Sequence, residues 1–154
     1  MLLSSVVALS VLALAASTEV RECPESSQRT VKNSVQLRPC KKLPCRLKKG
    51  TDQFIDIEFT PVTDINDLKN KVSANVFGVN VPFIGVDGNS ICDKVFNESG
   101  DKEMCPLKAG KKYIYKDSFP VLSFYPTINV DVHWSLESDK HDIVCFEVPA
   151  KIVQ

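Results

Sequence analysis

The sequence predicts one all-β domain folded as a sandwich of antiparallel strands. Apolar and polar residues alternate with period two over several short runs, as in strands that bury one face. Nine prolines and clusters of turn residues separate these runs. No stretch of the later chain has the spacing of an amphipathic helix. Together these observations favour a β-sandwich.

Four stretches of the chain carry the strand pattern. Residues 55–59 alternate isoleucine or phenylalanine with acidic residues, and residues 72–76 repeat the alternation. Residues 128–134 have the clearest pattern, with three polar residues set between isoleucine, valine and tryptophan. Residues 143–153 are rich in β-branched side chains and are predicted to form the last strand. A turn is predicted at residues 87–89.

Residues 1–17 are predicted to be a signal peptide. Their apolar core of about ten residues is followed by small residues, whereas a membrane span needs roughly 20 apolar residues. Cleavage after Ala15 or Ser17 fits the small residues at this point. Residues 18–154 then form a single domain, which we expect to be soluble and secreted, with the lysosomal lumen as an alternative destination.

The charge of the chain limits its partners. Lysine and arginine together number 19, as do aspartate and glutamate, so the formal net charge is zero. Nucleic-acid binding needs a basic excess that displaces counterions, so no nucleic-acid partner is expected. The densest basic stretch, residues 38–49, is either a solvated loop or a surface that docks on anionic lipid headgroups.

Six cysteines behind a secretion signal indicate disulfides, although sequence alone does not choose among the possible pairings. Loop length suggests three pairs, which are Cys40 with Cys45, Cys92 with Cys105, and then Cys23 with Cys145. A zinc site is the alternative, but the chain has only His133 and His141 and no pair of cysteines in CxxC spacing. We expect no metal and no cofactor.

No arrangement of residues in the sequence indicates catalysis. A nucleophile elbow of the G-x-S-x-G type is missing, and no cysteine is expected to stay free. His133 lies on the polar face of its predicted strand and His141 lies in a charged turn, so both are expected at the surface. The protein is therefore expected not to be an enzyme.

A glycosylation sequon, Asn97-Glu98-Ser99, lies between Cys92 and Cys105. The sequon predicts an N-linked glycan on Asn97, and it places the surrounding loop at the protein surface.

A series of short motifs resembles the ML lipid-recognition domain. They are residues 40–50 (CKKLPCRLKKG), 81–83 (VPF), 87–88 (DG) ahead of Cys92, 105–110 (CPLKAG), 113–115 (YIY), 119–121 (FPV), 124–126 (FYP), 132–134 (VHW) and 145–149 (CFEVP). Their order and spacing resemble the Niemann-Pick type C2 branch, also described as epididymal secretory protein E1-like, from Cys23 to the end of the chain.

The resemblance implies an immunoglobulin-like β-sandwich of two antiparallel sheets that enclose an apolar lipid cavity. It also implies the three disulfides suggested above and a sterol ligand. The residues that match the lining of the sterol pocket and its mouth are Phe83, Val121, Tyr125, Trp134 and Phe146. Trp134 has an equally plausible role as ordinary core.

The sequence also departs from vertebrate members of this branch. Phe146 stands where they tend to have tryptophan, and residues 84–86 replace a proline-rich run near the cavity mouth. Both features resemble arthropod members. The expected function is a monomeric, secreted carrier that binds one sterol and transfers it to membranes or to a membrane acceptor protein. The alternatives are a carrier of fatty acids or semiochemicals and an immune protein that recognises bacterial lipid A or lipopolysaccharide.

Overall fold

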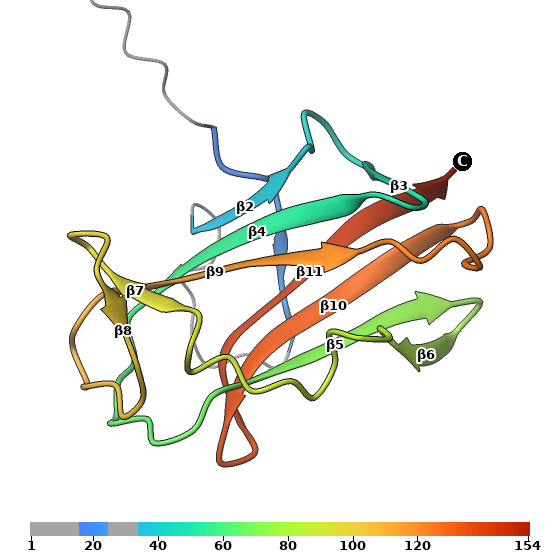
Figure 1. The fold of residues 1–154 in the computed structure, drawn as a ribbon. Helices are drawn as coiled ribbons and strands as arrows, with labels where there is room; N and C mark the ends of the chain where they lie inside the picture. Colours follow the sequence, from blue (N-terminus) through green and yellow to red (C-terminus); the bar gives the residue numbers. More distant parts are fainter. Residues whose placement is uncertain (1–15, 25–33) are drawn as a thin grey trace, which may run out of the picture.

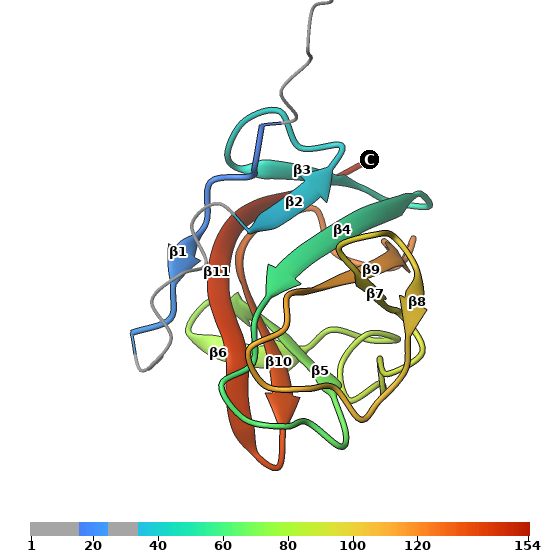
Figure 2. The same cartoon turned by 90° about the vertical axis from the view of Figure 1, so that its left-hand side faces the viewer.

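The computed structural model describes residues 16–24 and 34–154. Residues 1–15 of the predicted signal peptide lie outside the described residues. The described chain contains eleven strands and no helix, so no helix in it is long and apolar enough to cross a membrane. Two sheets face each other, which confirms the predicted all-β sandwich (Figures 1 and 2).

The first sheet has six strands. They are β1 (Arg21–Glu22), β3 (Cys45–Lys48), β5 (Lys69–Val76), β6 (Val79–Pro82), β10 (Asn129–Ser138) and β11 (His141–Val153). Their order is β1-β11-β10-β5-β6, and β3 also pairs with β11. The β3–β11 pair is parallel, with Ala150 opposite Cys45, whereas the other pairs in this sheet are antiparallel as predicted.

The second sheet has five strands in the order β2-β4-β9-β7-β8, and all its pairs are antiparallel. The strands are β2 (Val35–Arg38), β4 (Asp52–Phe59), β7 (Val95–Asn97), β8 (Lys102–Glu103) and β9 (Tyr113–Pro120). The β4–β9 pair lies opposite the first sheet (Figure 1), and buried positions recur along both strands.

The predicted strands agree with the structure where alternation was clear. Residues 55–59 lie in β4 and residues 72–76 lie in β5, and the apolar positions are buried in each except Val76, which is partly exposed. In β11 the alternation breaks down, because Val144, Cys145 and Phe146 are buried in succession. The outward-facing Cys145 is covered because β1 pairs with β11 there and Cys23 forms a disulfide with it.

The three expected disulfides are present, and the described residues include no free cysteine. They join Cys23 to Cys145, Cys40 to Cys45, and Cys92 to Cys105. The first closes the longest loop, with a sequence separation of 122 residues. In the chain-entropy model a loop of this length stabilises the fold by about 5 kcal/mol, which is more than either shorter loop contributes.

The interior between the sheets differs from one end to the other. At what we call the packed end, Phe59, Tyr113 and Leu136 fill the space, and the Phe59 and Tyr113 ring centroids lie 5.9 Å apart. At what we call the cavity end, β9 finishes, β10 begins, and the hairpin of β5 and β6 turns (Figure 1). The candidate site lies at the cavity end.

Candidate functional site

An apolar cavity lies between the two sheets at the cavity end. Its lining residues are all hydrophobic, and they are Leu37, Cys45, Leu47, Phe83, Phe119, Val132, Trp134, Val148 and Ala150. The centre of a water molecule could occupy about 20 Å³ of it. This is close to the space of a single water, whereas pockets for drug-sized ligands span roughly 300–1,000 Å³. A lipid could therefore enter only if the lining side chains or the sheets move apart at this end.

Two of the five predicted site residues line the cavity. Phe83 follows β6 and packs edge-on against Phe119, with ring centroids 5.7 Å apart. Trp134 lies on β10, and its ring centroid is 5.4 Å from that of Phe119. The three aromatic side chains come from both sheets and from the segment after β6, so they form one continuous apolar wall.

The other three predicted residues do not line the cavity, although Phe146 and Tyr125 contact this wall. Phe146 is fully buried on β11 and stacks on Trp134, with ring centroids 6.5 Å apart. Val121 is also buried, and its backbone N–H donates to the carbonyl oxygen of Thr51 at 2.9 Å. Tyr125 is half-buried, and its ring lies edge-on to Phe83 at 5.5 Å.

The hydroxyl of Tyr125 is a buried polar atom that lies near the backbone of Ile84. It is buried and has no hydrogen bond of good geometry among the described residues. Burial raises the pKa of the Tyr125 hydroxyl, and the nearby backbone of Ile84 opposes this shift. A buried hydroxyl without a hydrogen bond is unfavourable, so this group is available to a polar atom of a ligand.

Apolar side chains are exposed around the cavity end. Phe124 is 69% exposed, and its ring centroid lies 5.3 Å from that of Tyr125. Ile84 is also exposed beside the buried Phe83. At the tip of the β5–β6 hairpin, Phe77 is 94% exposed. Together with Val79 and Val81 on β6, we call these residues the apolar rim.

The basic stretch at residues 38–49 includes strand β3. Cys45 and Leu47 point toward the cavity from this strand, while Arg46 and Lys48 are exposed on its other face. Arg38 instead forms an ion pair with Asp56 at 2.9 Å. The cavity wall and part of the basic surface are therefore two faces of one short strand.

A chain of buried hydrogen bonds borders the cavity, and we call it the brace. The Nε1–H of Trp134 donates to Asn70 Oδ1 at 3.1 Å, and Asn70 Nδ2 donates to the Tyr115 hydroxyl at 2.8 Å. That hydroxyl donates to Asp117 at 2.8 Å, and Lys94 Nζ donates to the same carboxylate at 2.9 Å. The brace therefore runs from the cavity wall to a partly exposed lysine.

The environment of Tyr115 in the brace shifts its titration. Burial raises the pKa of the Tyr115 hydroxyl strongly, the hydrogen bond from Asn70 opposes the shift, and the charge of Asp117 adds to it. Tyr115 therefore stays neutral well above the pH at which an exposed tyrosine ionises. In this form its O–H is available as the donor to Asp117.

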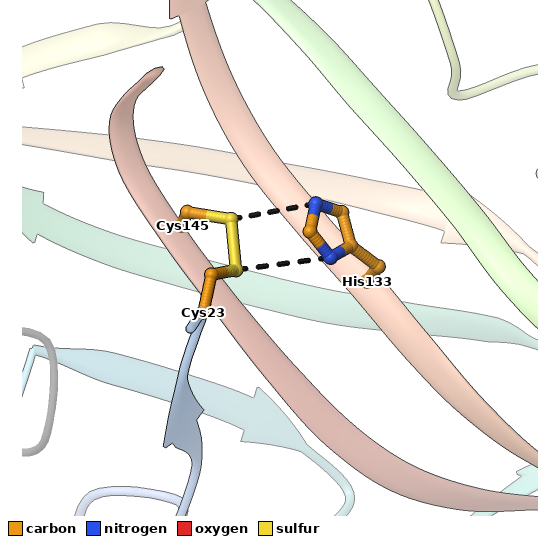
Figure 3. A group of neighbouring side chains, drawn as sticks. All are labelled: Cys23, His133 and Cys145. Carbon is orange, nitrogen blue, oxygen red and sulfur yellow. Dashed lines mark hydrogen bonds between the residues drawn. A yellow bond between two sulfur atoms is a disulfide. The ribbon is translucent and has the colours of Figure 1, made fainter. Parts of the chain in front are cut away.

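A third group contains the only closely spaced cysteine and histidine side chains among the described residues. His133 Nε2 lies 3.4 Å from Cys145 Sγ, and His133 Nδ1 lies 3.7 Å from Cys23 Sγ (Figure 3). Metal ions bind cysteine as thiolate, and both sulfurs here are joined in a disulfide. The arrangement is therefore not a metal site while this bond is intact. His133 is partly exposed and His141 is exposed.

The sequon asparagine lies at the end of β7. Asn97 Oδ1 accepts a hydrogen bond from the Asp101 backbone N–H at 3.0 Å, and Asn97 Nδ2 donates to Glu103 at 3.3 Å. Glycosylation of Asn97 stays a prediction.

Sequence reasoning did not single out most of the cavity lining or the brace. Val132 has the inward parity of a predicted strand, so its burial could be expected, but parity does not show where the interior is hollow. Asn70 has the same parity as Val72 and Ala74, and a polar residue on an apolar face was the available signal. Its partners depend on sheet pairing that the sequence does not show.

Comparison with known proteins places the chain among related sequences and folds. The model of the ML domain family matches residues 17–152. NPC intracellular cholesterol transporter 2 of Bos taurus is 32% identical over 146 residues, covering 94% of this chain and 91% of that protein. NPC intracellular cholesterol transporter 2 homolog a of Drosophila melanogaster is 31% identical over 154 residues, covering 99% of each. The crystal structure of a Niemann-Pick type C2 protein from Japanese carpenter ant has the same fold, with a TM-score of 0.67, 23% identity, and coverage of 90% of this chain and 96% of that one.

Proposed function

Because this chain belongs to the ML domain family, we propose that it is a lipid carrier that encloses one sterol or a similar apolar lipid between its two sheets. The observation that carries this proposal is the cavity, whose lining is hydrophobic throughout. The names of the bovine and fly relatives as cholesterol transporters support a sterol as the guest. An apolar cavity favours an apolar guest because water gains no hydrogen bonds in it.

The free energy of lipid burial is the term that offsets the cost of widening the cavity. A guest that buries about 15 methylene-sized groups gains about 12 kcal/mol at about 0.8 kcal/mol each. Association and ordering cost several kcal/mol, and separation of the sheets costs more. Total costs of about 4 kcal/mol would leave about 8 kcal/mol, which corresponds to micromolar affinity without any charged contact.

Tyr125 is proposed to contact the polar end of the guest. Its ring packs against Phe83 at the cavity, and its buried hydroxyl has no hydrogen bond of good geometry among the described residues. A sterol hydroxyl or a carboxylate at the mouth would provide that partner, so the guest would lie with its polar end toward Tyr125 and its apolar end inside.

Transfer is proposed to occur when the cavity end meets a membrane or a membrane acceptor protein. The apolar rim lies at this end, and exposed aromatic side chains are suited to the boundary between lipid and water. The exposed basic residues of the 38–49 stretch would add attraction to anionic headgroups, so added salt should slow transfer. The protein would act as a secreted or lysosomal monomer.

A titration with a fluorescent sterol tests the proposal. Delipidated protein is titrated with the sterol while energy transfer from Trp134, the only tryptophan of the chain, is followed. We expect saturation at one sterol per chain. A folded protein that binds neither the sterol nor competing fatty acids would overturn the carrier function, whereas competition by fatty acids alone would change the ligand class.

Matched substitutions locate the binding site. Val132→Phe fills the cavity and should weaken sterol binding by more than about tenfold, or about 1.4 kcal/mol. Val144→Phe makes the same change on β11, where Val144 pairs with Leu136 at the packed end, and should leave the affinity nearly unchanged. Val121→Phe reports whether Val121 lines the opened cavity. If both folded variants lost the same amount of sterol affinity, the result would contradict the proposed position of the binding site.

A further inference from the structure

The brace connects the two sheets by polar contacts in an interior that is otherwise mostly apolar. Trp134 and Asn70 belong to the six-stranded sheet, on β10 and β5, and Tyr115 belongs to the five-stranded sheet, on β9. All three side chains are buried, and Asn70 is only 2% exposed. The bond from Asn70 to the Tyr115 hydroxyl therefore joins one sheet to the other inside the sandwich.

The brace separates the packed end from the cavity. Along β9, Tyr113 fills the packed end, Tyr115 belongs to the brace, and Phe119 lines the cavity. Along β10, Leu136 is at the packed end and Val132 lines the cavity. Trp134 lies between them and has both roles, since its ring lines the cavity while its N–H bonds to Asn70.

The sheets are difficult to separate at the brace. Breaking the contact between Asn70 and Tyr115 without water would leave buried polar groups unpaired. Neighbouring hydrogen bonds that share donors and acceptors also support one another in a low-dielectric interior. Across the cavity, in contrast, apolar side chains meet, and their contacts can be exchanged for contacts with a lipid. Widening is therefore directed away from the brace.

We propose that Asn70 is a specificity-determining residue, because it fixes the Trp134 wall and so limits how long a ligand the cavity accepts. This inference rests on the proposed lipid-carrier function. The apolar end of the guest would reach Trp134 and stop there, because the brace holds the indole ring in place and the sheets together. Ligands beyond this length would leave part of their chain exposed at the mouth.

A series of straight-chain fatty acids of increasing length tests the limit. In the unmodified protein we expect the affinity to rise by up to about fourfold for each added methylene, and then to stop rising or to fall at a definite length. Asn70→Leu keeps a similar volume but removes the hydrogen bonds, and Asn70→Ala also removes bulk. Both should move the limit to longer chains. If the protein binds only sterols, sterols of graded side-chain length replace the fatty acids.

The control and the second variant separate this effect from a general loss of stability. Asn75→Leu changes an exposed asparagine on the same strand and should leave the limit unchanged. Tyr115→Phe removes only a hydroxyl and breaks the link between the sheets from the other side. Tyr115→Phe should move the length limit in the same direction as the Asn70 variants do. If the Asn70 variants do not fold, Tyr115→Phe alone tests the inference.

The indole N–H of Trp134 gives an independent measurement. Because the chain has one tryptophan, this group gives a single indole signal in a nitrogen–proton NMR spectrum. In Asn70→Leu the signal should shift and exchange faster with solvent, since its hydrogen bond to Asn70 is lost.

The outcomes distinguish the inference from the function on which it rests. An unmodified protein that binds no lipid rejects the carrier function. An unmodified protein whose affinity shows no limit with length rejects the brace as a wall. In Asn70→Leu, the Trp134 signal can show that the brace is broken. If the length limit then stays the same, the role of Asn70 is rejected. A limit that moves to longer chains in the Asn70 and Tyr115 variants alone supports it.

Discussion

Strands β9 and β10 run through both the packed end and the cavity end, yet the interiors of the two ends differ. At the packed end, Phe59 and Tyr113 lie in ring contact, and Leu136 on the facing sheet is fully buried. At the cavity end, β9 and β10 contribute Phe119 and Val132, and a small void remains between the sheets. The brace lies between the two ends. The apolar pattern along β9 and β10 therefore does not decide which end is hollow.

The contrast suggests that the packed end contributes mainly to stability and the cavity end mainly to binding. Close packing makes the packed end the main source of stability, because dispersion and burial grow with the number of contacting atoms. The cavity end has less to lose when its side chains part, since a ligand restores apolar contact there. We therefore expect substitutions at the packed end to lower stability and those at the cavity end to change binding.

Leu136→Ala should give the largest effect on stability. Removing a fully buried leucine side chain from the packed end should lower the free energy of unfolding by about 2–5 kcal/mol, in the upper part of this range. Urea denaturation measures the loss. Leu47→Ala, the same change at the cavity, should be near the lower end of the range, because β3 is a short strand that pairs only with β11.

Ligand titration of these two variants should give the opposite order. Leu47→Ala should change the affinity for sterol, whereas folded Leu136→Ala should bind as the unmodified protein does. A comparable loss of stability from both variants, together with equal changes in affinity, would remove the distinction between the two ends.

Tyr115→Phe should have an intermediate effect, which depends on pH. Near neutral pH the loss of the hydroxyl should lower the free energy of unfolding by about 1–2 kcal/mol. Burial raises the pKa of folded Tyr115 above its ordinary value of 10.0, whereas in the unfolded chain the group ionises near that value. Above about pH 10 the unfolded state therefore releases a proton that the folded state keeps, and stability falls as the pH rises.

Denaturation at several pH values checks the role of this tyrosine. The stability of Tyr115→Phe should fall less steeply above about pH 10 than that of the unmodified protein, because the variant lacks this titrating group. Parallel curves for the two proteins would show that Tyr115 does not carry the alkaline effect.

Much of the fold could be predicted from local pattern, but the interior could not. Alternation over residues 55–59 and 72–76 placed two strands and their buried faces, and the order of motifs indicated the family and the disulfides. Along β10, Leu136 and Val132 have the same inward parity, although Leu136 lies beyond the predicted run and fills the packed end while Val132 lines a void. Hollowness depends on the sizes of side chains facing each other from different sheets, and that pairing is not local in sequence.

Phe77→Asn should have the smallest effect on stability, in the favourable direction, and it tests the surface of the cavity end. Phe77 and Gly78 both have positive φ in the two-residue turn between β5 and β6, and asparagine before glycine suits such a turn far better than phenylalanine. We expect the variant to gain about 1 kcal/mol of stability.

Phe77→Asn should also transfer sterol to vesicles more slowly, because the apolar rim loses its most exposed aromatic ring. Val62→Asn, which changes a 73% exposed valine between β4 and β5, should leave transfer unchanged. A better turn with slower transfer would show that an exposed phenylalanine at this position serves the membrane contact, since the fold alone is better served by asparagine. Unchanged transfer, or an equal decrease in both variants, would exclude the hairpin tip as the contact surface.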